Sequence, residues 1–357
     1  MSKLVAVAAG GTGGHLFPAQ ALAEALAARG AGVHLLTDER VRDYGKNFPA
    51  LAVHEVPSAT LSLSQPLKIP ARVARLAGGF FKARRILQQV RPSVIVGFGG
   101  YPSLPPLLAA ASLGIPVVIH EQNAVMGRAN RLLSRFASVI ASSFPAIANH
   151  TGAVSYTGNP VRAAVKARAG AAYAVPGEAF RLLVFGGSQG ARFFGDFMPG
   201  AIAALSDADR RGLQIVQQCR PEDLERVGAA YAKLGVAHEL SQFFGDMPQR
   251  MAAAHLVIGR AGASTVAELG VVGRPALLVP LPHSLDNDQL RNAESFAGAG
   301  AGWIIAQSEL TPARFAAFFS PLRHSPTELA RAAAAALQSG VPDAAERLAD
   351  LVLRVAR

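Results

Sequence analysis

Cysteine is almost absent from this chain of 357 residues. The single residue, Cys219, excludes an internal disulfide and a zinc site built on cysteine pairs. A chain that does without disulfides is typical of a reducing compartment. The first apolar run, Leu4–Ala9, is too short for the core of a signal peptide. Both observations predict a protein that works on the cytoplasmic side.

Acidic residues are scarce in the first half of the chain, whose overall formal net charge is +11. Residues 1–161 hold 15 Lys and Arg against 6 Asp and Glu, whereas the remainder holds 20 against 18. Between Val56 and Gly177 the only acidic residue is Glu121. The strong positive charge of this half predicts an anionic partner. Three classes fit: a nucleic acid, a membrane surface or a phosphorylated ligand.

No apolar run free of helix breakers is long enough to cross a membrane. Pro92–Ile119 has no charged residue, but it contains five prolines and four glycines. The helix predicted inside it, Pro105–Leu113, would rise only ~15 Å, about half of the bilayer core. The stretch therefore predicts a strand, a glycine loop, a short helix and a second strand.

The loop AGGTGGHLFP (Ala9–Pro18) lacks both standard phosphate-binding fingerprints. Leu16 occupies the third glycine position of G-x-G-x-x-G, and His15 stands where a P-loop carries lysine. The loop predicts a strand-to-helix turn whose backbone closely approaches a ligand. The nature of that ligand has to come from the rest of the chain.

Short apolar runs alternate with helical patterns, which predicts an α/β fold with parallel sheets. The predicted strands are Leu4–Ala8, Val33–Leu36, Ser93–Val96, Val117–His120, Val139–Ala141, Arg181–Phe185, Gln214–Gln217, Leu256–Gly259 and Ala276–Val279. The predicted helices are Phe17–Arg29, Ala71–Val90, Pro105–Leu113, Gly127–Phe136, Glu222–Leu234, Ser264–Gly270 and one in the tail.

The pattern pauses near Asn159-Pro160 and then restarts. We therefore expect two doubly wound, Rossmann-like domains, residues 1–160 and 161–340, with a C-terminal helix in 341–357 that packs on the first. Ligands of open parallel sheets lie beyond the carboxyl ends of the strands, where this chain has three glycine loops. Two such domains facing across a cleft are the geometry of a nucleotide-sugar transferase.

Five motifs, taken in order along the chain, together resemble the MurG family of GlcNAc transferases. They are GGTGGHLFPA (Gly10–Ala19), GFGGYPSLPPLLAAASLGIPVVIHEQN (Gly97–Asn123), GNPVR (Gly158–Arg162), GGSQGA (Gly186–Ala191) and GRAGASTVAELG (Gly259–Gly270). The resemblance implies a glycosyltransferase fold of the B type. It also implies inverting transfer of GlcNAc from UDP-GlcNAc to the 4-hydroxyl of undecaprenyl-diphosphate-linked MurNAc-pentapeptide, the step that produces the second lipid intermediate of peptidoglycan.

Gly259–Glu268 is the strongest candidate for the donor site, and the resemblance favours a UDP diphosphate and ribose site there. A strand end turns into a helix near Ser264, whose N–H groups and dipole attract an anion. Arg260 adds a positive charge, and Glu268, one turn into the helix, is placed to accept both ribose hydroxyls. The alternative is an ordinary helix start with a solvated glutamate.

The resemblance extends the donor site to other positions. It implies contacts to UDP-GlcNAc from Asn123, Arg162, Ser188, Phe244, Ala263, Ser264, Thr265, Val266, Ala267, Glu268 and Gln289. Phe244 stands where the family presents backbone groups to uracil, commonly from an aliphatic residue. The loop before Gln289 departs from the commonest family pattern. Without the resemblance, the glycine turn around Ser188 also fits a plain tight turn.

His15 and Glu121 are the two candidates for the base. An inverting displacement needs a group that accepts the proton of the acceptor hydroxyl near neutral pH. Histidine suits this role, and Glu121 either serves directly or orients His15. From the residues alone, a capping or packing role for His15 is the alternative. The resemblance implies that Thr12, Gly13 and Gly14 present backbone N–H groups to the acceptor diphosphate or the incoming sugar.

Two D-x-D patterns, Asp207-Ala208-Asp209 and Asp286-Asn287-Asp288, raise the question of a metal ion. Patterns this short arise readily by chance. The helix end at Ser264 and Arg260 are suited to neutralise the leaving diphosphate instead. We therefore expect no catalytic metal and no cofactor.

The stretch Leu67–Arg91 has seven basic residues and no acidic one. Its apolar side chains fall on one side of a helix, a pattern that binds anionic lipid by shallow insertion and charge. A solvated basic helix is the alternative, and phosphate contacts to nucleic acid are a third possibility. No basic–aromatic nucleic-acid motif accompanies it, so we expect a peripheral protein at the cytoplasmic face of the membrane. A UDP-GlcNAc epimerase and a nucleic-acid-binding protein are the competing hypotheses.

Overall fold

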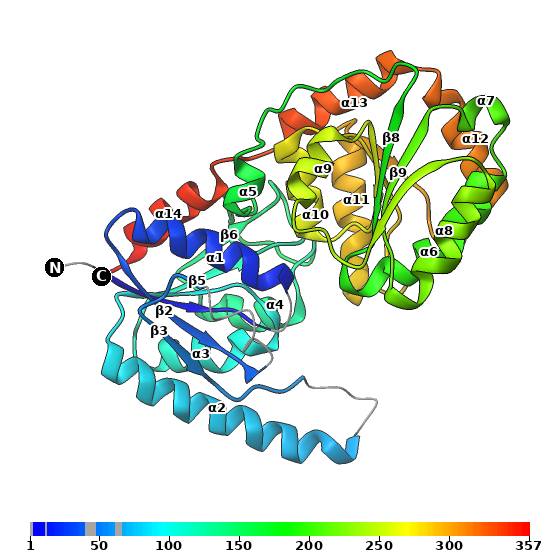
Figure 1. Cartoon of the computed structure of the whole chain (residues 1–357). Helices are drawn as coiled ribbons and strands as arrows, with labels where there is room; N and C mark the ends of the chain where they lie inside the picture. Colours follow the sequence, from blue (N-terminus) through cyan, green and yellow to red (C-terminus); the bar gives the residue numbers. More distant parts are fainter. Residues whose placement is uncertain (1–2, 11–12, 40–47, 61–65) are drawn as a thin grey trace. The chain divides into compact units, whose positions relative to one another are not determined.

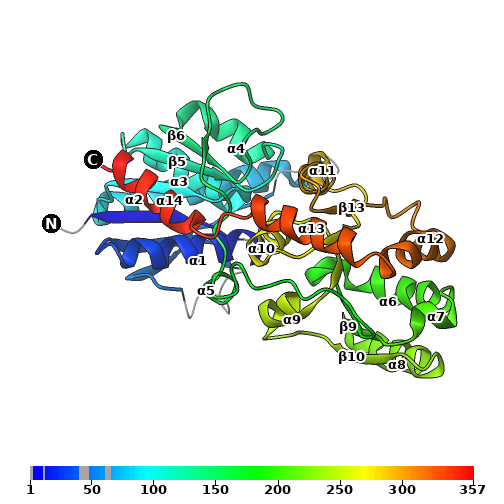
Figure 2. The ribbon, with the colours of Figure 1, turned by 90° about the horizontal axis from the view of Figure 1, so that it is seen from above.

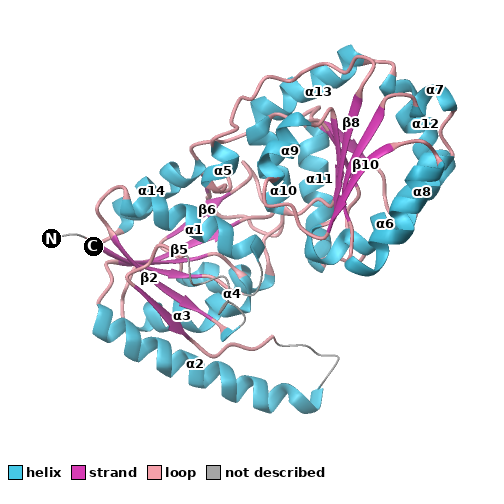
Figure 3. Ribbon diagram, in the orientation of Figure 1, coloured by secondary structure: helices cyan, strands magenta, loops and turns pink. Residues whose placement is uncertain are grey.

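The computed structural model describes residues 3–10, 13–39, 48–60 and 66–357 (Figure 1). The chain divides into two compact units, Met1–Ala163 with Val341–Arg357, and Ala164–Gly340. Each unit contains a parallel sheet covered by helices on both faces (Figure 3). The predicted fold class, two doubly wound α/β domains, is confirmed.

The described part of the first unit forms a seven-stranded parallel sheet. Its strands are β1 (Leu4–Ala8), β2 (Gly32–Thr37), β3 (Ala52–Glu55), β4 (Val94–Gly97), β5 (Val117–Glu121), β6 (Val139–Ser142) and β7 (Ser155–Tyr156). Their order is β3-β2-β1-β4-β5-β6-β7, so Val5 pairs with Val33 on one side and Val94 on the other. The strand order reverses between β1 and β4, and the crevice beyond their carboxyl ends is where such sheets bind ligands.

Helices cover both faces of this sheet. They are α1 (Gly13–Ala27), α2 (Ile69–Val90), α3 (Gly100–Ser112), α4 (Arg128–Leu133) and α14 (Ala344–Val355), while α5 (Ala163–Lys166) leads into the second unit. Helices α1 and α14 run side by side on one face, and α2 and α3 pack together on the other (Figures 1 and 2). Leu22 and Leu26 of α1 and Leu348 and Val352 of α14 are fully buried in one core. The C-terminal helix therefore belongs to the first unit.

Only the C-terminal half of α2 packs closely against the rest of the first unit. Its buried residues are Gly79, Ala83 and Leu87, spaced four apart along one side. A Cβ on Gly79 would lie 2.0 Å from the carbonyl oxygen of Pro57, so only glycine permits this close approach. No residue of Ile69–Gly78 is buried. The N-terminal half of α2 therefore presents its side chains largely to the surroundings.

The second unit repeats the arrangement with a six-stranded parallel sheet. Its strands are β8 (Phe180–Phe185), β9 (Leu213–Gln218), β10 (Ala237–Ser241), β11 (Leu256–Gly259), β12 (Ala276–Leu278) and β13 (Gly302–Ile304). Its helices are α6 (Gly187–Ala203), α7 (Asp207–Arg210), α8 (Leu224–Lys233), α9 (Met247–Ala253), α10 (Ala263–Val272), α11 (Asp288–Gly298), α12 (Pro312–Arg323) and α13 (Pro326–Ser339). The order β10-β9-β8-β11-β12-β13 reverses between β8 and β11.

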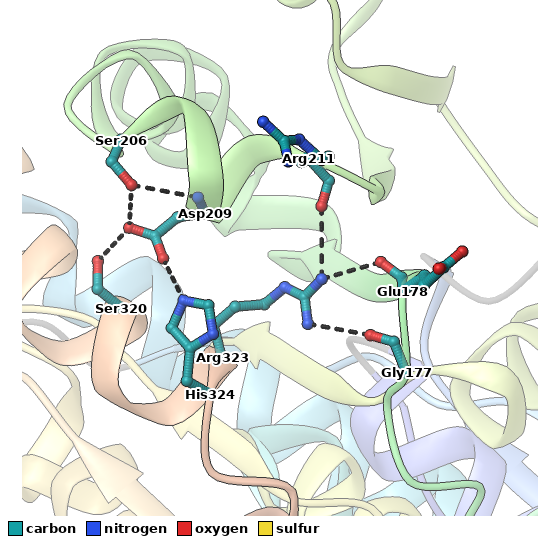
Figure 4. Close-up of polar contacts among 8 residues, drawn as sticks. All are labelled: Gly177, Glu178, Ser206, Asp209, Arg211, Ser320, Arg323 and His324. Carbon is teal, nitrogen blue, oxygen red and sulfur yellow. Dashed lines mark hydrogen bonds and ion pairs between the residues drawn. The ribbon is translucent and has the colours of Figure 1, made fainter.

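A polar cluster ties α7 to the end of α12 (Figure 4). The carboxylate of Asp209 accepts hydrogen bonds from the hydroxyls of Ser206 and Ser320, at 2.7 and 2.8 Å, and from Nε2 of His324 at 2.8 Å. Next to His324, the guanidinium of Arg323 donates to the carbonyls of residues 177, 178 and 211. The first D-x-D pattern thus fastens two helices of the second unit together.

Candidate active site

His15 lies at the switch point of the first sheet, in the first turn of α1. Its Nδ1 is 3.0 Å from Oε1 of Gln122, the residue that follows β5. On its other side, a Cβ built on Gly100 would lie 3.5 Å from Nε2 and Cδ2 of the ring. Gly100 has φ +70°, which favours glycine and allows α3 to begin directly after β4. Two segments, which follow the neighbouring strands β4 and β5, therefore approach the imidazole of His15.

Glu121, the last residue of β5, is 2% exposed and has a different set of partners. Its carboxylate accepts hydrogen bonds from the backbone N–H groups of Asn123 and Gly127, each at 3.0 Å, and from Nδ2 of Asn130 at 2.8 Å. Burial raises the pKa of the Glu121 carboxyl, and these three donors act against that rise. The carboxylate therefore holds the loop that follows β5.

Sequence reasoning missed Gln122. Orienting His15 is one of the two roles that the sequence predicts for Glu121, but the side chain that contacts His15 is that of Gln122. Successive side chains of a strand point to opposite sides, so two adjacent residues at a strand end rarely reach the same group. That alternation was the available signal, but it does not by itself say which of the two faces His15.

Gly13, Gly14 and Arg162 lie around the start of α1, whereas Asn123 follows β5. Gly13 and Gly14 form the first turn of α1, and Thr12 lies outside the described residues. A Cβ on Gly13 would come within 2.9 Å of the Phe17 ring, and the guanidinium of Arg162 lies over that ring at 4.8 Å. The phenyl ring therefore connects Arg162 to the glycine turn.

The second unit places a helix N-terminus at its own switch point. Helix α10 begins directly after Gly262, a residue with no side chain to cap it. Ser264 lies in the first turn, and Glu268, 8% exposed, follows in the second. The other predicted residues on these turns are Ala263, Thr265, Val266 and Ala267. The start of a helix carries N–H groups and partial positive charge, which suit an anionic ligand.

Arg260 is buried beside this helix start, with 6% exposure. Its Nη1 donates to the carbonyls of Val279 and Pro280, at 3.0 and 3.2 Å, and its Nη2 to Oε1 of Gln307 at 2.6 Å. The guanidinium also lies over the rings of residues 193 and 194 of α6, at 4.9 and 5.3 Å. Burial lowers the pKa of Arg260 to about 10, which leaves it charged near neutral pH. In this structure Arg260 holds the turn after β12, and its positive charge is buried three residues before the start of α10.

Ser188, Phe244 and Gln289 come from three other segments of the second unit. Ser188 lies in the first turn of α6, after Gly187 with φ +64°. Phe244 follows β10 and is buried under the guanidinium of Arg250, 4.3 Å from its ring centre. Oε1 of Gln289 in α11 accepts a hydrogen bond of 3.0 Å from the backbone of Leu281. Ser188 is thus at the switch point, while Phe244 lies two strands away.

The acidic patterns have structural partners in this unit. Asp288 accepts a hydrogen bond of 2.7 Å from the backbone N–H of Gln289, and Asp209 belongs to the cluster of Figure 4. Within the described ranges, no three His, Cys, Asp or Glu side chains are grouped to hold a metal ion. Likewise, none of the described helices combines the length and the apolar character needed to span a bilayer.

Two doubly wound units, each with a glycine turn at its switch point, form the two-domain architecture of the B-type glycosyltransferases. The model of the glycosyltransferase family 28 N-terminal domain matches residues 5–142, and that of the C-terminal domain matches residues 181–348. A transferase of Sinorhizobium fredii, described as UDP-N-acetylglucosamine–N-acetylmuramyl-(pentapeptide) pyrophosphoryl-undecaprenol N-acetylglucosamine transferase, is 52% identical over 99% of this chain and 95% of its own length. The crystal structure of Acinetobacter baumannii MurG is 34% identical, with a TM-score of 0.79 and 99% of both chains covered. The chain belongs to the MurG family of N-acetylglucosamine transferases.

A UDP-N-acetylglucosamine 2-epimerase shares the architecture, with a TM-score of 0.68 over 98% of this chain and 95% of its own. Its sequence is only 13% identical, so this likeness concerns the fold alone.

Proposed function

We propose that this protein moves GlcNAc from UDP-GlcNAc to the 4-hydroxyl of MurNAc in undecaprenyl-diphosphate-linked MurNAc-pentapeptide, with inversion at the anomeric carbon. The observation that carries the proposal is 52% identity, over essentially the whole chain, to a transferase described by that donor and acceptor. The two switch points supply suitable chemistry, a helix start for a diphosphate in one unit and a histidine in the other.

The second unit is proposed to hold the donor. The leaving UDP develops negative charge on its diphosphate as the bond to the sugar breaks. The start of α10, which includes Ser264, carries partial positive charge that attracts the diphosphate. The buried Arg260 cation lies next to it in the chain. Preorganised donors of this kind stabilise a transition state without reorganising during the reaction. In this proposal Glu268 accepts hydrogen bonds from the ribose hydroxyls, and Phe244 and Gln289 contact the base and the sugar.

The first unit is proposed to hold the acceptor, with Gly13 and Gly14 presenting backbone N–H groups. Asn123 and Arg162 complete the contacts to the donor sugar or diphosphate. His15 takes the proton of the acceptor hydroxyl while that oxygen forms its bond to the anomeric carbon. The bond between this carbon and the UDP oxygen breaks at the same time, and its electron pair leaves with the diphosphate. Attack from the side opposite the leaving group inverts the centre.

The direct test is transfer of labelled GlcNAc from UDP-GlcNAc to a short-chain analogue of the MurNAc-pentapeptide lipid, with and without a chelator. We expect a disaccharide-lipid product in both reactions, because the helix start and Arg260 neutralise the leaving group. Folded protein that binds UDP but forms no such product would contradict the acceptor assignment. Turnover of UDP-GlcNAc without any acceptor would favour an epimerase.

We also propose that α2 docks the protein on anionic lipid, so that the enzyme is peripheral to the cytoplasmic face of the membrane. The half of α2 without buried residues carries Val73, which is 50% exposed, and Phe81, 67% exposed, follows in the C-terminal half. Leu67, just before the helix, is 95% exposed. Basic side chains surround them, of which Lys68, Lys82 and Arg85 are exposed. Apolar side chains that insert shallowly, with cations around them, are suited to a negatively charged headgroup layer.

Flotation with phosphatidylglycerol-containing vesicles tests this surface. We expect Val73→Glu to weaken binding several-fold, because it places a charge where an apolar side chain would insert. Val175→Glu is the matched control, since Val175 is 55% exposed in the second unit. Binding should also weaken with salt, because exposed charges are screened. Equal loss with both variants, or RNA binding tighter than vesicle binding, would contradict the membrane assignment.

A further inference from the structure

The hydrogen bond between His15 and Gln122 determines which ring nitrogen carries the proton. Oε1 of Gln122 is a carbonyl oxygen and only accepts hydrogen bonds. With Oε1 placed 3.0 Å from Nδ1, as in this structure, Nδ1 of His15 is the donor, whereas a reversed amide would turn its NH₂ group toward the ring and select the other tautomer. In the neutral ring the lone pair is then on Nε2, because an imidazole carries a single N–H. Gln122 is 4% exposed, which restricts its side chain to a narrow range of positions.

The partner of His15 is also neutral, and this has a chemical consequence. A carboxylate at the same place would stabilise the imidazolium and keep the ring protonated. A carboxamide orients the ring without adding a charge, and it selects the Nδ1–H tautomer when its oxygen faces Nδ1. The adjacent carboxylate, Glu121, is turned toward Asn123, Gly127 and Asn130 instead. The ring edge that carries Nε2 lies next to Gly100, and a Cβ built on that glycine would lie 3.5 Å from Nε2.

We propose that Gln122 is the positioning residue of the base: it holds His15 in the Nδ1–H tautomer, so that Nε2 accepts the proton of the acceptor hydroxyl. This inference rests on the proposed function of His15. When Nε2 takes the proton, the ring becomes an imidazolium whose Nδ1–H still donates to Oε1 of Gln122. The hydrogen bond therefore persists through the transfer, and the proton on Nε2 is later released to water.

Two variants separate positioning from simple packing. Gln122→Met keeps the length of the side chain but removes the carbonyl, so we expect kcat to fall about tenfold or more with little change in KM for UDP-GlcNAc. Gln122→Glu keeps an acceptor for Nδ1–H and adds a negative charge. We expect it to retain activity at alkaline pH and to move the acid limb of the kcat/KM profile up by about one pH unit. Gln20→Met is the matched control, because Gln20 lies on α1, as His15 does, and among the described residues its side chain bonds only to Glu24.

Imidazole ¹⁵N NMR of the full chain reads the tautomer without an activity assay. The chain has nine histidines, and the spectrum of His15→Gln identifies the signals of His15. We expect an Nδ1–H signal pattern for His15 in the wild type and in Gln20→Met, and a mixture of tautomers in Gln122→Met. An Nε2–H tautomer in the wild type, or an acid limb that does not move in Gln122→Glu, would overturn the inference. If the tautomer responds as expected but no GlcNAc is transferred, the proposed function fails while the role of Gln122 in orienting the ring stands.

Discussion

Glu121 and Gln122 are adjacent at the end of β5, but they have different partners and therefore different roles. Glu121 is an acid surrounded by three N–H donors, and Gln122 is an amide whose oxygen faces a histidine. A buried carboxylate that accepts three hydrogen bonds would lose them if it turned toward an acceptor hydroxyl. His15 is half-buried in the first turn of a helix, next to the glycine turn. These contacts favour His15 over Glu121 as the base.

This assignment predicts opposite consequences for substitutions of the two residues. Glu121→Gln replaces one acceptor oxygen with an NH₂ group that faces a donor, which should cost about 1–3 kcal/mol. We expect it to lower the melting temperature of the first unit by several degrees. His15→Gln should leave the melting temperature nearly unchanged but lower kcat at least a hundredfold. Thermal unfolding and single-turnover kinetics on the same preparations check both. Loss of kcat without loss of stability in Glu121→Gln would return Glu121 to the role of base.

The residue types of the site could be predicted from the sequence, whereas their contacts could not. The position of His15 after a glycine turn pointed to the right region. Arg260 was expected to act on a phosphate, yet its Nη atoms donate to Val279, Pro280 and Gln307. Those partners lie 19 to 47 residues away in the chain. No local pattern encodes such a contact, because it depends on how β12 and the segment after β13 pack beside β11.

At the scale of elements, strands were easier to predict than the starts of helices. Buried parallel strands read as continuous apolar runs bounded by glycine and proline, and β1 and β11 have the predicted bounds. Helix α3 was expected from Pro105 but begins at Gly100. Two glycines and a proline argue against helix locally, but Gly99 and Gly100 provide the positive φ angles that turn the chain out of β4.

The same physical reason explains two other helices. Helix α1 begins at Gly13, four residues before the predicted start at Phe17, so His15 is on the helix and not in the loop before it. Helix α6 follows Gly186 directly but was not predicted, because the glycine-rich stretch at its start weakens the helical pattern. Glycine disfavours a helix interior by about 1 kcal/mol, and packing of the helix on its sheet outweighs that cost. In both cases the mispredicted stretch is the glycine turn at the switch point of its sheet.

For the whole molecule, the two units have separate hydrophobic cores. The first gathers β1, β2, β4, α1 and α14, and the second gathers β8, β9, β11, α6 and α12. The chain leaves the first unit near Ala163 and returns to it at Val341. Lys3 also donates to the carbonyls of Leu353 and Ala356, which ties the two ends together. The last helix therefore contributes to the stability of the unit that begins the chain.

This arrangement predicts that a cavity in α14 destabilises only the first unit. Leu348 is fully buried against α1, and Leu348→Ala should cost about 2–5 kcal/mol. In a unit of this size that corresponds to a fall of roughly 5–15 °C in the melting temperature. Leu337→Ala, in α13 of the second unit, is the matched control, because Leu337 is 44% exposed and should lose little.

Scanning calorimetry with and without UDP distinguishes the two units. UDP should raise the transition of the second unit, because a ligand stabilises only the state that binds it. Leu348→Ala should then lower the other transition and leave the UDP-dependent one in place. If both transitions moved together, the two cores would unfold as one cooperative block. If only one transition shifts in each experiment, the two units unfold independently. UDP binding to the second unit and the stability of the first are then set by different parts of the chain.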